Sequence, residues 1–175
     1  MAVYTKFTKD DIKSILSNYL IGDLESYEGI QEGIENTNYF LLVNKKKYIL
    51  TIYEKRVKEE DLPFFSKLMG SLNKSGFKCP VPILNKRNEA ISKFNNKKLM
   101  IVSFIEGKAK NVLSPEDCKS VGKEAARMHE ITKNFKIKRQ NDLSISSWRK
   151  IFNSVKDKCN HIHKDLPKLI ESNLV

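Results

Sequence analysis

The sequence predicts an α+β fold in which a mainly antiparallel sheet, interrupted by one helix, comes before a region of helices alone. Three observations predict it. Apolar residues recur at helical spacing near the N-terminus, β-rich runs separated by short turns fill residues 27–56 and 79–107, and helical patterns alone follow Gly107. A chain of 175 residues has room for one domain, or for one domain and part of another.

The first helix is expected to begin after Thr8, which is a good N-cap residue. Asp10 and Asp11 lie in its first turn, where negative charge is favoured, and Gly22 is expected to end it. The apolar residues at helical spacing predict one buried face made of Ile12, Ile15, Leu16, Tyr19 and Leu20.

Residues 27–56 have the pattern strand, glycine-bearing turn, strand, short basic turn, strand. Two apolar runs, FLLV and YILTIY, form the second and third strands. Glycines at the tip of a hairpin let backbone N–H groups approach a phosphate, because glycine has no Cβ and tolerates positive φ. Protein-kinase-like enzymes cover ATP with such a hairpin, so the pattern indicates a nucleotide site.

The remaining elements follow from turn and cap signals. A charged segment precedes a helix with Pro63 in its first turn and Gly76 after its end, CPVPIL is extended, and residues 85–107 form a hairpin whose buried strand is LMIVSFI. Ser114 and Pro115 begin a further helix. Its inward face is expected to hold Val121, Ala125 and Met128, and a last helix carries an apolar stripe of Trp148, Ile151, Phe152, Val155, Cys159 and Ile162.

The formal charge of +11 favours a solvated surface over a nucleic-acid footprint, because the basic residues are nearly all lysine and are spread along the chain. No run of eighteen apolar residues and no N-terminal apolar signal occurs, and the three cysteines make no CxxC pair. We therefore expect a cytoplasmic protein with reduced thiols and neither a membrane nor a nucleic acid as partner.

The change in pattern near Gly107 predicts two lobes. Residues 1–106 read as a protein-kinase-like N-terminal nucleotide-binding lobe, a small antiparallel sheet with one inserted helix. Residues 107–175 read as the start of a helical C-terminal lobe.

Five segments resemble the bacterial homoserine kinases of the aminoglycoside phosphotransferase and choline kinase superfamily: YEGIQEGIENTNYFL, YILTIYEKRVKEEDLPFF, CPVPIL, IVSFIEG and NDLSISSWRKIF. The resemblance runs almost end to end. It implies ATP-dependent phosphorylation of the hydroxyl of L-homoserine to O-phosphohomoserine in threonine biosynthesis, with Mg²⁺ as the metal. A GxxxxGK[ST] loop does not occur in the chain, and neither does the PxxxGLGSSA loop of the other homoserine kinase type.

The resemblance also implies which residues bind ATP. Gly29, Gly33, Asn36 and Asn38 match the hairpin that covers the phosphates, and the backbone of Ser103, Phe104 and Ile105 matches the strand that bonds the adenine edge. The alternative for the hairpin is an ordinary β-turn with polar tips. The alternative for residues 103–105 is a core strand that ends in a glycine turn.

The third strand departs from the protein-kinase pattern, because Thr51 stands where a lysine would hold the phosphates. Lys55 and Arg56 follow at the strand end, and Glu59 or Glu60 is a candidate ion-pair partner; we include Lys55 and Glu60 in the predicted ATP site. The alternative is a solvated charge cluster.

The catalytic HxDxxxxN loop and the following IDF segment of the family do not occur in these residues. We therefore expect the catalytic and Mg²⁺-binding residues beyond Val175, no turnover by this chain alone, and self-association through the uncovered apolar faces of the later helices. His161, His163 and Asp165 imitate part of the loop, but Ile170 stands where its asparagine belongs. Cys159 with the two histidines offers too few ligands for zinc.

Two other functions keep the same fold. One is a kinase of another small alcohol, such as choline or an aminoglycoside, and the other is a non-catalytic nucleotide-binding fragment. A basic nucleic-acid-binding protein is disfavoured because no stripe of interleaved aromatic and basic residues is present.

Overall fold

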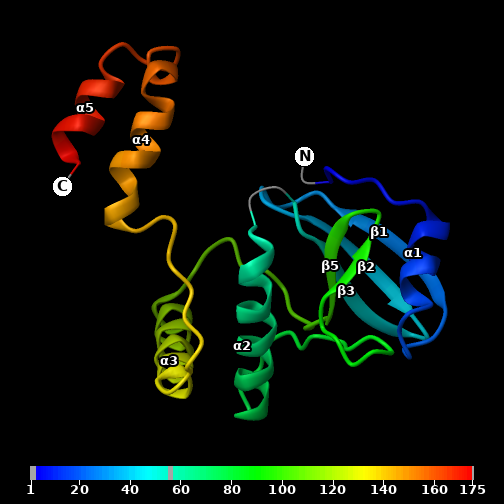
Figure 1. Cartoon of the computed structure of the whole chain (residues 1–175). Coiled ribbons are helices and arrows are strands. Elements are labelled where there is room, and N and C mark those ends of the chain that lie inside the picture. Colours follow the sequence, from blue (N-terminus) through cyan, green and yellow to red (C-terminus); the bar gives the residue numbers. More distant parts are fainter. Residues whose placement is uncertain (1–2, 55–56, 175) are drawn as a thin grey trace. The chain divides into compact units, whose positions relative to one another are not determined.

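A computed structural model of the chain describes residues 3–54 and 57–174 (Figure 1). A three-stranded antiparallel meander, β1 to β3, and a β4–β5 hairpin build its sheet, and the strand order is β1-β2-β3-β5-β4 with every neighbouring pair antiparallel. The strands are β1 (Leu24–Ile30), β2 (Thr37–Val43), β3 (Lys46–Ile52), β4 (Ser92–Phe94) and β5 (Lys97–Ser103). The predicted α+β class and both predicted hairpin regions are confirmed.

Two-residue turns close the β2–β3 and β4–β5 hairpins. Asn44 and Lys45 have φ values of 44° and 60°, and Asn95 and Asn96 have 45° and 60°. Positive φ at both turn residues matches the right-handed twist of the strands, and asparagine tolerates this region better than most residues do. The asparagines therefore set the register of both hairpins.

One face of the sheet is buried against helix α1 (Lys9–Leu16), which contributes Ile12, Ile15 and Leu16 to the core. We call this the covered face. Along β2 and β3, residues on this face are buried and alternate with half-buried residues of the opposite side, which we call the second face. The core of the covered face also includes Phe7, Tyr39, Leu41, Val43, Leu50, Ile52, Leu99 and Ile101.

Helix α1 begins as predicted and ends earlier than predicted. The Thr8 hydroxyl accepts from the Asp11 amide while the Asp11 carboxylate accepts from Thr8, which is a capping box. The helix ends at Leu16, not at Gly22, because the side chains of Ser17 and Asn18 bond back to the Ser14 carbonyl. Leu20, predicted to be buried, therefore lies beyond the helix and is 84% exposed.

Helix α2 (Leu62–Lys74) follows a short 3-10 turn, η1 (Glu59–Asp61), with Pro63 in its first turn as predicted. Gly76 follows its end with φ +72°. Helix α3 (Pro115–Thr132) packs beside α2, and Arg127 donates to the Gly76 carbonyl at 2.9 Å. The N-cap at Ser114 is confirmed.

The predicted inward face of α3 is wrong at Val121, which is 67% exposed. Ala125 and Met128 are half-buried. The reason is that α2 contacts α3 along one side, and no described residue of α3 is fully buried.

Residues 139–175 form a second compact unit, distinct from residues 1–138. The predicted single last helix is two helices, α4 (Ile145–Cys159) and α5 (Leu166–Asn173), because the chain turns at residues 160–165. Phe152 and Cys159 of the predicted stripe are buried, whereas Ile162 lies in the turn and is 79% exposed. The predicted lobe boundary at Gly107 falls inside the larger unit and stays a prediction.

The described helices include none that is both long and apolar enough to cross a membrane.

Candidate functional site

Two of the predicted site residues meet on the second face of the sheet. Asn38 on β2 is the register partner of Thr51 on β3, and the Thr51 hydroxyl donates to Asn38 Oδ1 at 2.8 Å. Phe40 and Ile49 lie on the same face, two register pairs further along, and all four side chains are half-buried. The arrangement places a polar pair directly beside an apolar surface.

The glycine-bearing loop of residues 31–36 joins β1 to β2 next to this polar pair. Gly33 has φ +113°, a conformation that side chains rarely adopt, so a glycine is required there. The Asn36 side-chain oxygen accepts from the Glu54 amide at 3.3 Å. A shallow cavity of about 300 Å³ lies at the start of the loop, lined by Glu28, Gly29, Ile30, Gln31, Glu32 and Phe40.

Gly29 has a packing role that the sequence does not predict. A Cβ at this position would lie 3.0 Å from the Val3 side chain and 3.6 Å from the Tyr39 ring. The glycine therefore lets the N-terminal segment pass close over the covered face of β1.

At the end of the predicted adenine-binding strand, the backbone amides differ in whether they are already hydrogen-bonded within the protein. The Ser103 amide donates to the Val81 carbonyl at 2.9 Å and the Phe104 amide to the Lys47 carbonyl at 3.2 Å. The Ile105 amide has no hydrogen-bond partner among the described residues, so it is the first amide of this segment that is free to bind a ligand.

Aromatic and charged contacts fix this segment onto the second face. The Phe104 ring packs edge-to-face on Phe40 with centroids 5.5 Å apart, and the Lys47 ammonium lies 5.6 Å from the Phe104 centroid. Lys47 also pairs with Glu106 at 2.6 Å. Phe40 therefore links the glycine-loop hairpin to residues 104–106.

Lys55, predicted to lie in the ATP site, and its neighbour Arg56 are both outside the described residues. Glu60 is exposed within η1, and its neighbour Glu59 pairs with Lys98 at 3.3 Å. Lys98 lies on the second face, two residues before Met100, the register partner of Thr51. Among the described lysine and arginine residues of the sheet, Lys98 therefore lies nearest to Thr51 along the paired strands β3 and β5.

Glu54 is a site residue that the sequence prediction missed. Its carboxylate accepts from the Thr5 hydroxyl at 2.6 Å and the Thr37 hydroxyl at 2.9 Å, and it pairs with the Lys97 ammonium. The Thr37 oxygen in turn accepts from the Tyr4 and Thr5 amides at 3.0 and 3.1 Å. We call this network the Glu54 clasp. Its members come from positions 4, 5, 37, 54 and 97, and no local sequence pattern connects them.

The clasp holds Glu54 ionised. Burial alone would raise the pKa of Glu54, but the hydrogen bonds from Lys97, Thr5 and Thr37 outweigh burial and lower the pKa below its ordinary value of 4.5. Because the folded-state pKa is the lower one, ionised Glu54 stabilises the fold above pH 4.5, and that stability is lost as the pH falls through the folded-state value.

We predict that the free energy of unfolding falls more steeply below pH 4.5 in the wild type than in Glu54→Gln, because glutamine has no proton to take up. Urea unfolding followed by far-ultraviolet circular dichroism at pH 7, 5 and 4 measures this difference. Parallel pH dependence of the two proteins would contradict the prediction.

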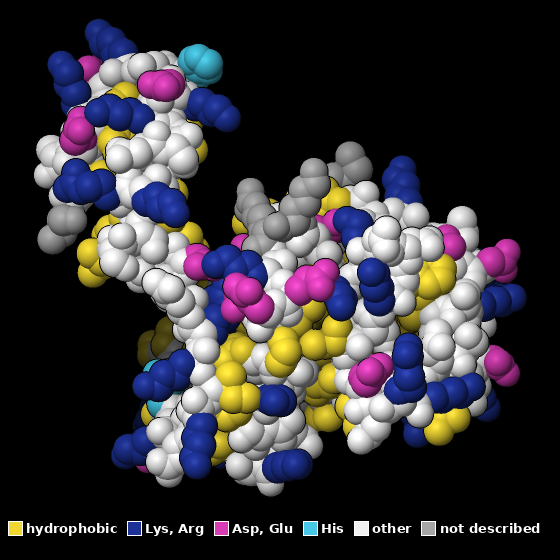
Figure 2. Space-filling model, in the orientation of Figure 1, with side chains coloured by type: hydrophobic (Ala, Val, Ile, Leu, Met, Phe, Trp, Pro, Cys, Tyr) yellow, Lys and Arg dark blue, Asp and Glu magenta, His cyan; other side chains and the backbone are white. Residues whose placement is uncertain are grey.

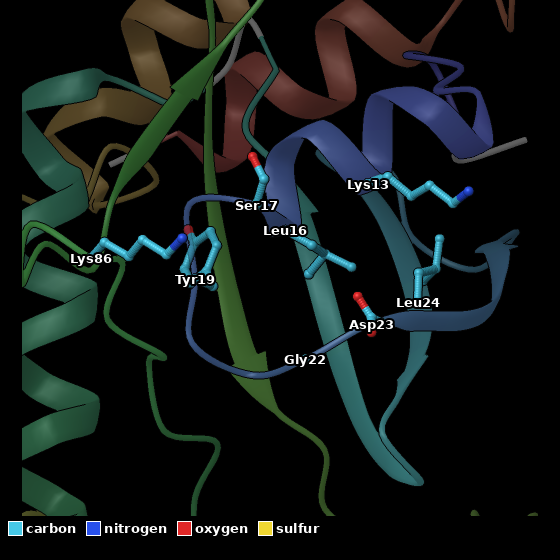
Figure 3. A pocket seen from close by; sticks show the side chains of 8 residues that line it. All are labelled: Lys13, Leu16, Ser17, Tyr19, Gly22, Asp23, Leu24 and Lys86. Atoms are coloured by element: carbon cyan, nitrogen blue, oxygen red, sulfur yellow. The ribbon is translucent and has the colours of Figure 1, made fainter.

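A cavity larger than the one beside the loop lies elsewhere, at the C-terminal end of α1 (Figure 3). It has a volume of about 650 Å³ and is lined by Lys13, Leu16, Ser17, Tyr19, Gly22, Asp23, Leu24 and Lys86. It contains none of the predicted site residues. Size alone therefore does not locate the candidate site.

Neither a concentrated patch of one charge on the face in view nor a cluster of metal ligands among the described residues marks the site. On the face in view, lysine and arginine side chains are spread out with aspartate and glutamate among them (Figure 2). Within residues 3–54 and 57–174, no group of three or more histidine, cysteine, aspartate or glutamate residues is arranged to hold a metal ion.

Comparison with known sequences shows a match to the phosphotransferase enzyme family over residues 26–167. Homoserine kinase of Beijerinckia indica is 39% identical over 174 residues, which are 99% of this chain and 54% of the relative. Homoserine kinase of Agrobacterium fabrum is 39% identical over 166 residues, 95% of this chain and 52% of the relative. The chain spans about half the length of these curated relatives.

Comparison with solved structures shows the same fold at low sequence identity. A spectinomycin phosphotransferase in complex with ADP and spectinomycin has a TM-score of 0.58 and 15% identity, with 96% of this chain and 59% of that chain covered. A microcompartment-associated aminopropanol kinase has a TM-score of 0.62 and 11% identity, with 93% and 58% covered.

Proposed function

The chain belongs to the phosphotransferase enzyme family, and on that premise we propose that it is the nucleotide-binding part of a kinase that phosphorylates the hydroxyl of L-homoserine. The product would be O-phosphohomoserine, in threonine biosynthesis, and the reaction would take place in the cytoplasm. The observation that carries the proposal is 39% identity to the homoserine kinase of Beijerinckia indica along 99% of this chain.

The second face offers groups that suit a nucleotide. Phe40, Ile49 and Val102 give an apolar surface for the base, and the free Ile105 amide can donate to a ring nitrogen. At the other end of the same face, the amides of residues 31–36 and the Asn38–Thr51 pair can contact phosphates. ATP supplies the phosphoryl group.

The described residues hold no group of three or more histidine, cysteine, aspartate or glutamate residues arranged for a metal ion, and the chain contains no HxDxxxxN sequence. Phosphoryl transfer depends mainly on positioning and on electrostatic stabilisation by metal ions and carboxylates. We therefore propose that these 175 residues bind ATP without transferring its phosphate, and that the Mg²⁺ ligands belong to the part of the relatives that the chain does not cover.

The direct test is ATP binding by the purified 175-residue chain, measured by calorimetry and by competition against a fluorescent ATP analogue. We expect saturable ATP binding and no ATP-dependent phosphorylation of homoserine. Absence of binding at millimolar ATP would refute the nucleotide site, and measurable phosphorylation would refute the inactivity of the isolated chain.

Testing which alcohol accepts the phosphate requires a longer protein than this chain. We expect a chimera of this chain with the uncovered half of Agrobacterium fabrum homoserine kinase to phosphorylate homoserine, whereas that half alone should be inactive. Choline and spectinomycin serve as competing acceptors. Preference for either over homoserine would favour the alternative alcohol-kinase function.

We also propose that the chain self-associates through residues 139–175. A groove of about 600 Å³ on this unit is lined almost wholly by apolar side chains: Leu143, Trp148, Ile151, Phe152, Val155, Leu169, Ile170, Asn173 and Leu174. Trp148 is 44% exposed and Ile151 40%. An apolar surface of this kind in water favours association.

Ile151→Lys is predicted to shift the chain toward monomer at micromolar to millimolar concentration, because a lysine in the groove loses hydration when a second copy docks. Ile162→Lys is the matched control, since Ile162 is 79% exposed outside the groove. Sedimentation velocity measures the size, and the fluorescence of Trp148, the single tryptophan, reports burial. A wild type that stays monomeric at all concentrations would contradict the prediction.

A further inference from the structure

We infer that Glu54 is a positioning residue for the glycine-bearing loop, residues 31–36, and that it fixes this loop where its amides contact the phosphates of a bound nucleotide. The inference rests on the proposed nucleotide-binding function. It assigns to Glu54 a role distinct from those of Asn38, Thr51 and the residues at the adenine end.

The first argument is that the side-chain hydrogen bonds of the Glu54 clasp meet at one carboxylate that is almost buried. The Glu54 side chain is 11% exposed, although Lys97 is 36% exposed. The contacts join the N-terminal segment, the start of β2, the end of β3 and the start of β5. Charge-assisted hydrogen bonds are about twice as strong as neutral ones, so the clasp fixes four segments at one point.

The second argument is that Glu54 holds the exit of the loop. Its amide donates to Asn36, the last loop residue, and its carboxylate accepts from Thr37, the first residue of β2. The tip of the loop is held through Tyr4, since Ile34 is 74% exposed and its carbonyl accepts from the Tyr4 hydroxyl at 3.0 Å. The clasp therefore restrains the exit of the loop directly and its tip through Tyr4, which lowers the ordering cost of binding a ligand.

The third argument locates the effect at the phosphate end of the site. Thr37 is the register partner of Ile52, two residues before Glu54, whereas the Ile105 amide follows Ser103, the register partner of Tyr48 at the opposite end of β3. At about 3.3 Å per strand residue, the two ends are more than 10 Å apart. Loss of the clasp should thus weaken phosphate contacts and leave base contacts in place.

A competing explanation is that Lys97 contacts the phosphates directly. In that case Glu54 would restrain Lys97, and removing the Glu54 charge would leave triphosphate binding unchanged or strengthen it. The two explanations therefore predict opposite results for the same variant.

The experiment compares ATP with adenosine as ligands of the 175-residue chain, for the wild type, Glu54→Gln and Glu25→Gln. Glu25 is the matched control, since its carboxylate accepts from the Lys45 amide at the far end of the β1–β2 pair. We expect Glu54→Gln to bind ATP about tenfold more weakly while its affinity for adenosine changes less than about twofold. Glu25→Gln should bind both ligands as the wild type does.

The ratio of the two affinities separates a positioning role from general destabilisation, which would weaken both ligands together. An equal loss for ATP and adenosine, no loss, or tighter ATP binding in folded Glu54→Gln would overturn the inference. If Glu54→Gln does not fold, Thr5→Val removes one donor to the carboxylate and keeps the Lys97 pair; about threefold weaker ATP binding with unchanged adenosine binding is then expected. A wild type that binds neither ligand would refute the proposed function instead.

Discussion

Gly22→Ala is expected to lower the free energy of unfolding of the sheet-bearing unit by about 3 kcal/mol. Gly22 has φ +104°, where an L side chain is strained. A Cβ there would also lie 2.1 Å from Asn44 Nδ2 and 2.4 Å from Asn44 Cγ. The Asn44 side chain would have to move, and it would lose the hydrogen bond that it accepts from the Asp23 amide at 3.2 Å.

Gly70→Ala is the matched control, because Gly70 lies within α2 and its added Cβ would meet no atom within 4 Å. We expect it to raise stability by about 0.5–1 kcal/mol, since alanine is the better helix former. Urea unfolding should be followed by far-ultraviolet circular dichroism, because Trp148 lies in the other compact unit. A loss below about 1 kcal/mol for Gly22→Ala would contradict the prediction.

Thr37→Val is expected to cost about 3 kcal/mol, although it preserves the shape of the side chain. The Thr37 side chain is fully buried, and its oxygen accepts from two backbone amides while its hydroxyl donates to Glu54. Valine can make none of these bonds. The substitution therefore leaves the amides of Tyr4 and Thr5 without an acceptor and removes a donor from a carboxylate that is 11% exposed.

Thr51→Val in the neighbouring strand is the comparison. Its hydroxyl makes one hydrogen bond, to Asn38, and its side chain is half-buried, so we expect a cost of about 1 kcal/mol or less. Hydrogen exchange gives an independent measurement, because the amides of Tyr4 and Thr5 should exchange faster in Thr37→Val. Equal stability of the two variants would show that the Thr37 network contributes nothing beyond a single half-buried hydrogen bond.

The sheet could be predicted from the sequence because its signals are local. Alternating apolar residues in β2 and β3, and asparagines in the two-residue turns, specify strands and hairpins within a few positions of one another. The end of α1 could not be predicted in this way, because it depends on Ser17 and Asn18 bonding back to the helix while Tyr19 pairs with Asn85.

The candidate site could be predicted only where its residues carry a signal in their own stretch of sequence. Asn38 and Thr51 could be found because each matches a family position, and the fold then places them in contact. Glu54 could not be found, because its partners lie 49, 17 and 43 residues away along the chain. Val121 was assigned to a buried face by periodicity alone, yet burial needs a neighbouring element that covers the position.

The hydroxyl at position 51 has a consequence for chemical labelling. Acylating nucleotide analogues mark kinases by transferring an acyl group to the lysine amine beside the phosphates, and Thr51 carries no amine at the corresponding position. Here the described amines near that end of the sheet belong to Lys97 and Lys98, and each is engaged by a carboxylate. On the proposed function, an acylating ATP analogue would have to displace one of these ion pairs to label a described amine, whereas a photoreactive adenine analogue needs no amine.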